Sequence, residues 1–245
     1  MTTTLDLSTE HLAALAATAL VTAALCAAAR RRPGPWVLPA SIALGALVAG
    51  SEAAWIAWLV WRGAWTPATG LPLQLCDAAT ALAAAALWTR RQALVELLWF
   101  WALAGTLQAL LTPDVQQRFP DALWLQYYAV HGGIVAAALF LVVGLRIRPR
   151  RGAAVRAAAL TAAYAAVVGA VDLVTGGDYL FLRQPPADPS LLDAMGPWPW
   201  YLPGAAVLAI VLFALLQAPF QAGAATRRCS RQRSSAIVQD SHAGS

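Results

Sequence analysis

Cys76 and His131 are the two residues of this chain whose side chains could together carry out nucleophilic chemistry. A thiol attacks as its thiolate, and a nearby imidazole can take the proton while a third polar group orients the ring. Asp77, Asp172 and Gln126 are candidates for that third group. A free cysteine more often behaves as a small buried hydrophobe. The pair therefore predicts a thiol–imidazole site only if the fold brings both side chains together.

The composition indicates that membrane helices must position these residues. The chain is 60% hydrophobic and 12% charged, whereas about a quarter of the residues of a soluble domain are charged. All 17 basic residues are arginine, which excludes lysine Schiff-base chemistry and with it a retinal protein. Three cysteines without a CxxC spacing predict neither a disulfide framework nor a structural metal. No cofactor is expected, and the arginines flank apolar runs, so no nucleic-acid partner is expected either.

Seven apolar runs are long enough to span a bilayer. A hydrocarbon core about 30 Å thick needs about 20 apolar residues per helix. The runs are 11–29, 36–61, 71–88, 92–111, 122–145, 157–175 and 201–220. They predict an all-α fold, a seven-transmembrane-helix bundle that forms one domain over residues 1–220. Residues 221–245, rich in Arg, Ser and Gln, are predicted to be a disordered basic cytoplasmic tail.

The arginines predict the orientation of this bundle. Fourteen of them flank the ends of the spans on one side, and only Arg62, Arg118 and Arg183 lie on the other. Because basic residues are retained in the cytoplasm, the N-terminus is expected outside and the C-terminus inside. The expected location is the cell membrane, as a multi-pass protein.

Polar side chains inside the predicted spans gather in one half of the membrane. An ionisable side chain in a span costs about 2.5–3.5 kcal/mol to insert, which makes it a functional candidate. The residues in the outer half are Glu52, Cys76, Asp77, Gln108, Gln126, His131 and Asp172. Glu96 lies in the other half, where it can reach Arg90 or Arg91. The pattern predicts a shared polar cavity that opens to the outside.

These polar residues also have structural interpretations. Gln108 and Gln126 can bond neighbouring helices, and Glu52 can be a protonated core carboxyl. Asp77 can satisfy the start of its helix, and Asp172 can cap the junction that follows its own helix.

Several motifs resemble those of a known family. They are LPLQLC ending at Cys76, GTLQALLTPD at 105–114, HGG from His131, DYLFL from Asp178, and SLLDAMGPWPWY at 190–201. Together they resemble the YwaF-like family of bacterial integral membrane proteins, whose distant eukaryotic relatives are cysteine-dependent, multi-spanning phospholipid acyltransferases. The resemblance implies that Cys76 is the nucleophile and His131 its partner. The chain departs from the pattern at Gln74, where a histidine is expected.

The resulting hypothesis is an acyltransferase or acyl hydrolase that acts on membrane lipid from the outer leaflet. Cys76 would attack the acyl carbonyl and His131 would move the proton, while Gln108 or backbone amides stabilise the oxyanion. Trp198, Trp200 and Tyr201 suit the headgroup level of the bilayer. They predict either a lid over the cavity or an aromatic anchor for the last span.

The alternative is a non-enzymatic protein with binding, receptor-like or transport function. In it Glu52, Asp77 and Asp172 would hold a cation, a proton or a small polar ligand in the outer-facing cavity. Membrane lipid is the expected partner in the enzymatic hypothesis. The sequence leaves the oligomeric state open.

Overall fold

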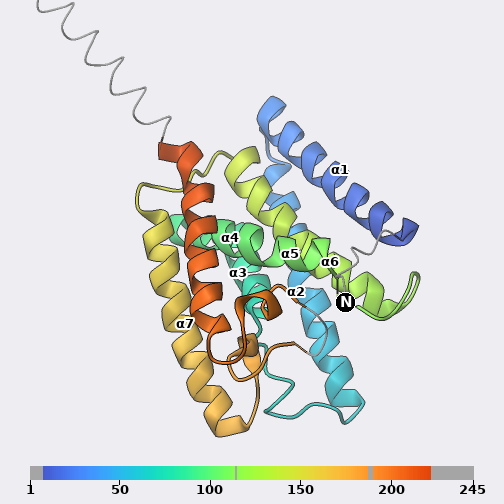
Figure 1. Cartoon of the computed structure of the whole chain (residues 1–245). Helices are drawn as coiled ribbons and strands as arrows, with labels where there is room; N and C mark the ends of the chain where they lie inside the picture. Colours follow the sequence, from blue (N-terminus) through green and yellow to red (C-terminus); the bar gives the residue numbers. More distant parts are fainter. Residues whose placement is uncertain (1–7, 114, 187–189, 222–245) are drawn as a thin grey trace, which may run out of the picture.

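The computed structural model describes residues 8–113, 115–186 and 190–221, and their regular secondary structure is helical. Figure 1 shows the long helices gathered into one bundle. The helices are α1 (Thr9–Arg31), α2 (Val37–Trp61), α3 (Leu75–Thr89), α4 (Gln92–Trp101), α5 (Leu107–Leu111), α6 (Ala122–Leu139), α7 (Ala153–Thr175) and a final helix, Tyr201–Gln221. Two π-helical turns, η1 (Ala102–Thr106) and η2 (Phe140–Gly144), extend α4 and α6, and two 3₁₀ turns, η3 (Tyr179–Phe181) and η4 (Asp193–Met195), lie in the loop before the final helix.

Six helices of the described residues are long and apolar enough to cross a membrane. The predicted count of seven is not confirmed, because α3 has only 15 residues and so spans about 22 Å of a core about 30 Å thick. The predicted span begins at Leu71, but residues 71–74 are not helical. The helix begins only after Gln74, whose backbone is extended.

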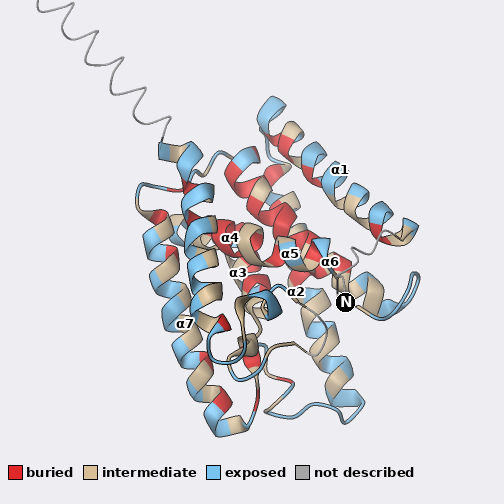
Figure 2. Ribbon diagram, viewed as in Figure 1, coloured by how far each residue is buried: buried red, intermediate tan, exposed pale blue. Residues whose placement is uncertain are grey.

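α3, α4 and α6 form the interior of the bundle. Figure 2 shows their buried residues concentrated together, while α1, α7 and the final helix expose most of their surface. Glycine allows α6 to approach its neighbours closely: a Cβ on Gly133 would lie 2.3 Å from Cγ1 of Val48 on α2. α2, α3 and α6 all pack against one another. They are the helices that carry Glu52, Cys76 and His131.

α7 and the final helix lie side by side and antiparallel (Figure 1). The backbone N–H of Ala154, at the start of α7, donates to Oε1 of Gln217 near the end of the final helix. Aromatic side chains attach the final helix to α4, with the Phe100 and Phe213 ring centroids 5.0 Å apart.

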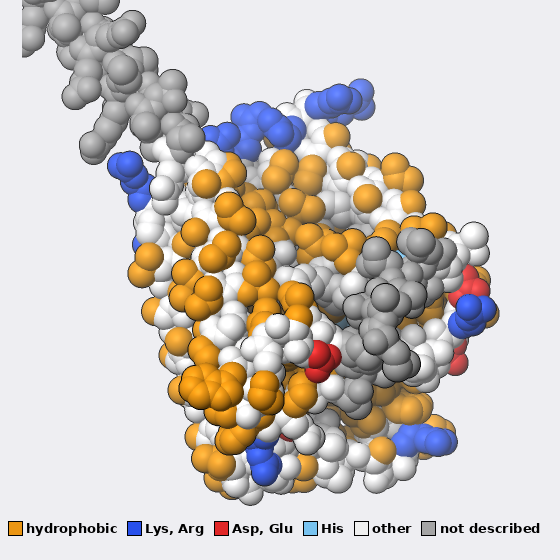
Figure 3. Space-filling model, in the orientation of Figure 1, with side chains coloured by type: hydrophobic (Ala, Val, Ile, Leu, Met, Phe, Trp, Pro, Cys, Tyr) orange, Lys and Arg blue, Asp and Glu red, His pale blue; other side chains and the backbone are white. Residues whose placement is uncertain are grey.

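Arginines concentrate at one end of the bundle. Figure 3 shows their side chains along the upper edge, near the end of α1 and the start of α7 in Figure 1. The loop at 62–74 and the described residues 176–186 after α7 lie at the other end (Figure 1). Which end faces the cytoplasm stays a prediction, as does the division into a domain and a tail. Residues 222–245 of that tail lie outside the described residues.

Candidate functional site

A cavity of about 330 Å³ lies between α2, α3, α6 and the loop that precedes α6. Its lining contains both Cys76 and His131. The other lining residues are Glu52, Trp55, Asp77, Val115, Gln117, Leu123, Gln126, Tyr127 and Val130. The structure thus places five of the candidates, from three helices, around one space. Their chemical roles remain predictions.

His131 is oriented by its own helix. Its Nδ1 lies 2.8 Å from the backbone carbonyl oxygen of Tyr127, and its ring stacks on the Tyr127 ring at a centroid distance of 4.1 Å. Because a carbonyl oxygen can only accept, Nδ1 carries the proton in this contact, and whenever the ring is neutral its lone pair is at Nε2. A proton acceptor at Nε2 is what a thiol partner requires. This contact comes from the backbone one turn earlier, so the side-chain pattern gave no sign of it.

Cys76 lies in the first turn of α3. The N-terminal end of a helix favours negative charge and thereby a thiolate. The nearby carboxylates of Glu52 and Asp77 oppose it, because they share the cavity. Asp77 is held at this end by the backbone N–H of Gln74, which donates to its Oδ2 at 3.0 Å. Asp77 therefore both caps α3 and lines the cavity.

A smaller cavity of about 120 Å³ adjoins the first. Both are lined by Glu52, Trp55 and Asp77. The smaller one extends to the loop at 69–72 and to Tyr179. The two carboxylates therefore stand at the junction of the cavities.

Gln74 and Asp172 anchor the segment that follows α7. Oε1 of Gln74 accepts from the backbone N–H of Leu180 at 3.0 Å, and Oδ1 of the buried Asp172 accepts from that of Tyr179, also at 3.0 Å. Of the roles predicted for Asp172, capping of the junction after α7 agrees best with its hydrogen bond to the N–H of Tyr179. Gln74 lines the smaller cavity only.

Tyr179 completes this anchor, and the sequence analysis did not single it out. Its hydroxyl donates to the carbonyl of Pro67 at 3.0 Å and accepts from the N–H of Leu71 at 2.9 Å. Burial raises the pKa of Tyr179, so the phenol stays protonated and keeps its donor. The signal available was its place in the DYLFL motif, directly after an acidic residue.

Gln108 lies outside the cavity lining. Its side chain is exposed, and its Nε2 donates to the carbonyl of Ala104 at 3.0 Å. The π-helical turn η1 precedes it, and one additional residue in a helix turns everything after it by about 100°. An oxyanion role for Gln108, which assumed a regular helix, has no support in this geometry.

The predicted lid residues contact the loop and not the cavity. Trp198 and Trp200 are exposed, and Nε1 of Trp198 donates to the carbonyl of Leu182 at 3.1 Å. Tyr201 is buried and donates to the carbonyl of Phe181. These contacts favour the anchor over the lid.

Metal ligands do not gather in the described residues: no group of three or more His, Cys, Asp or Glu side chains could hold an ion there.

Comparison with known proteins gives one match. The model of the TMEM164 family matches residues 7–217, which include every helix described above except the end of the last one. The narrower likeness to YwaF-like proteins stays a resemblance. The chain matches no curated protein and no solved structure. With most of its length matched and six helices able to cross a membrane, this chain belongs to the TMEM164 family, a family of multi-pass membrane proteins.

Proposed function

We propose that this protein is a cysteine-dependent acyltransferase or acyl hydrolase that acts on membrane lipid. The observation that carries the proposal is the shared cavity, in which a thiol at a helix N-terminus and an imidazole with its lone pair at Nε2 line the same space.

The reaction would proceed through an acyl-enzyme. Nε2 of His131 takes the proton of the Cys76 thiol, and the thiolate attacks the acyl carbonyl carbon of the lipid ester. Backbone amides of the first turn of α3, which carries Cys76, would stabilise the oxyanion in place of Gln108. The tetrahedral intermediate expels the lipid alkoxide, which takes the proton from His131 and leaves a thioester on Cys76.

The second half restores the enzyme. The hydroxyl of an acceptor lipid, or of water, loses its proton to His131 and attacks the thioester carbonyl. Collapse releases the new ester or the free acid, and the thiolate regains its proton. Transfer and hydrolysis thus differ only in the acceptor.

The mixed polar and apolar lining of the cavity supports a lipid substrate. Val115, Leu123 and Val130 add apolar surface to the lining beside the polar groups. A volume of about 330 Å³ holds a reacting ester and part of its chains, with the remainder along the apolar helix faces. Sites of this size are typical for small-molecule ligands.

Covalent labelling tests the proposal. The purified full chain is incubated with a phospholipid that carries a radiolabelled acyl group, and protein-bound label is measured before and after hydroxylamine, which cleaves thioesters. Wild type should carry hydroxylamine-sensitive label, Cys76→Ala none, and His131→Gln much less. Cys26→Ser is the matched control, because Cys26 is buried against the end of α6 and is absent from the cavity lining. Equal labelling of wild type and Cys76→Ala would refute the mechanism.

A non-enzymatic binding function is the second candidate, favoured by the carboxylates of Glu52 and Asp77 at the junction of two cavities. In that case Cys76→Ala keeps ligand binding, whereas Glu52→Gln with Asp77→Asn loses it. Wild-type protein would then carry no acyl label.

A further inference from the structure

Eight exposed arginines gather at one end of the bundle. This arginine surface consists of Arg30, Arg31, Arg32, Arg90, Arg91, Arg146, Arg148 and Arg151. They come from the end of α1, the turn between α3 and α4, and the segment between η2 and α7. Three separate parts of the chain therefore contribute to it.

Contacts between these parts hold the three groups together. A Cβ on Gly144 would lie 3.5 Å from Cβ of Ala29, so the end of α1 touches the end of η2, directly before the 145–152 segment. Nε2 of Gln92 donates to the carbonyl of Arg148 at 2.9 Å, which joins that segment to the start of α4. These contacts hold the three parts of the chain at the same end of the bundle.

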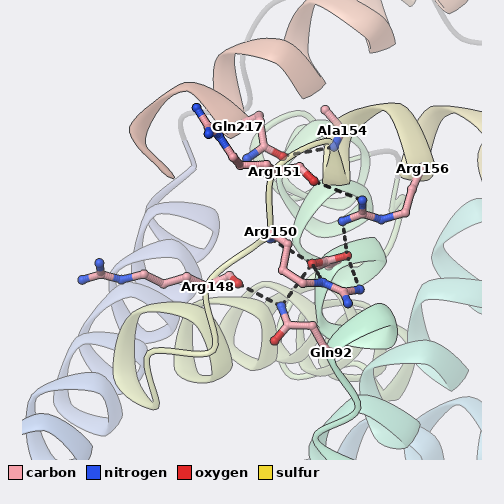
Figure 4. A network of polar contacts seen from close by, with 8 residues as sticks. Gln92, Arg148, Arg150, Arg151, Ala154, Arg156 and Gln217 are labelled. Carbon is pink, nitrogen blue, oxygen red and sulfur yellow. Dashed lines mark hydrogen bonds and ion pairs between the residues drawn. The ribbon is translucent and has the colours of Figure 1, made fainter. Parts of the chain in front are cut away.

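No described carboxylate neutralises this surface. Glu96 is the acidic residue at this end of the described chain, and two other arginines occupy it: Nε of Arg150 lies 2.8 Å from Oε1, and Nη2 of Arg156 lies 2.9 Å from Oε2 (Figure 4). The surface thus holds a positive charge that no ion pair with Glu96 reduces, and an anionic partner would balance it. Closely spaced guanidinium groups suit phosphate oxygens, which they bind through two parallel hydrogen bonds.

Two of these arginines occupy backbone positions that favour glycine. Arg90 has φ 51° and Arg146 has φ 61°, both in the left-handed region. Glycine takes this region at no steric cost, and the chain uses it so at Gly152 and Gly176. Arginine at such a position is conformationally unfavourable. Glycine would therefore fit the backbone at either position, and replacing these arginines by glycine removes the guanidinium groups without straining the chain.

Exposed apolar side chains lie directly beside Arg90. Its Nη2 is 3.4 Å from Oγ of Ser41, near the start of α2. Leu38 and Ile42 flank that serine and are about half exposed, as is Trp88, two residues before Arg90. An amphiphile can place its phosphate on the arginines and its chains along these side chains.

We propose that the arginine surface binds the headgroups of anionic phospholipids. These are distinct from the ester substrate of the cavity, which lies toward the other end of α2 and α6. The proposal stands whether or not the protein is an enzyme. Basic residues next to membrane helices attract anionic headgroups in this way.

Thermal unfolding of the full chain in detergent tests this. Wild type is titrated with phosphatidylglycerol, with phosphatidylcholine, and with inorganic phosphate. Phosphatidylglycerol should raise Tm by several degrees beyond phosphatidylcholine, because a ligand that binds only the folded state stabilises it. Equal shifts with both lipids, or the same shift with inorganic phosphate, would overturn the proposal.

Two sets of variants locate the effect. Arg31→Gln, Arg91→Gln and Arg148→Gln together should remove more than half of the phosphatidylglycerol shift. The matched control changes three arginines that are not part of the surface, Arg62, Arg118 and Arg183, to glutamine and should keep the shift. Equal losses in both triple variants contradict an arginine-surface site.

Glycine substitution separates binding from folding. Arg90→Gly with Arg146→Gly should unfold no earlier than wild type in phosphatidylcholine, since glycine fits the backbone, yet lose part of the phosphatidylglycerol shift. Native mass spectrometry gives a second readout, with fewer phosphatidylglycerol molecules bound to this variant. An unchanged number bound and an unchanged shift would rule out these two guanidinium groups.

Discussion

Carboxylates in the two halves of the bundle have different surroundings. Glu96, at the arginine end, is 4% exposed, and its oxygens accept from Gln92, Arg150 and Arg156. Glu52, in the other half, lines two cavities, and so does Asp77. A buried charge is costly unless it is paired and hydrogen-bonded. The complete pairing of Glu96 indicates a structural role, whereas carboxylates that face open space are available to a ligand.

The charge of Glu96 should matter most for stability. Glu96→Gln keeps the size of the side chain but loses both ion pairs and turns an amide N–H toward donors. We expect the free energy of unfolding to fall by about 2–3 kcal/mol, from lost charge-assisted hydrogen bonds. Chemical denaturation in mixed micelles measures it. A change below about 0.5 kcal/mol, the usual range for surface substitutions, would remove the contrast between the halves.

The contact between α2 and α6 should have the second largest effect on stability. Gly133→Ala places a Cβ 2.3 Å from Cγ1 of Val48, and overpacking of this kind costs about 1–3 kcal/mol. Because α2 and α6 carry Glu52 and His131, acyl labelling should decrease as well.

A second substitution and a control test whether the close contact with Val48 causes the loss of stability. Val48→Ala added to Gly133→Ala should restore much of the stability. Gly50→Ala, also on α2, meets nothing within 4 Å and should stabilise by about 0.5–1 kcal/mol. Equal destabilisation at Gly133 and Gly50 would contradict the close approach.

The sequence predicts the long helices better than the surroundings of the site. Apolar length is a local property, and the predicted run 92–111 coincides with the structure. The run at 157–175 begins earlier, at Ala153, because Gly152 adopts φ 72° and starts the helix there. Arg156 thereby lies inside α7, where it reaches Glu96.

Departures from regular helix explain most of the differences at the site. The turn η1 places Gln108 away from the cavity, and the extended backbone of Gln74 delays the start of α3. Neither effect alters apolar length, so a search for spans cannot detect it. Cys76 and His131 were found because their side chains are chemically distinctive. Tyr179 was missed because its role depends on backbone partners distant in the sequence.

Tyr179 tests how far the loop anchor supports the cavity. Tyr179→Phe removes a hydroxyl that bonds Pro67 and Leu71, and we expect a loss of about 1–2 kcal/mol from the buried groups left without partners. The start of α3 should become more mobile. Acyl labelling at Cys76 should therefore decrease by a larger fraction than the free energy of unfolding. Labelling that stays at the wild-type level would show that the anchor does not position the nucleophile.

Glu52→Gln should have the smallest effect on stability and sharpens the comparison with Glu96→Gln, since both make the same chemical change. Because Glu52 borders cavities, water can solvate the carboxylate, and neutralising it also relieves repulsion from Asp77. We therefore expect a change within about 0.5 kcal/mol, of either sign. Denaturation alongside Glu96→Gln measures the difference directly. A loss as large as that at Glu96 would mean that Glu52 is a structural carboxylate, and the distinction between a paired half and an open half of the bundle would not hold.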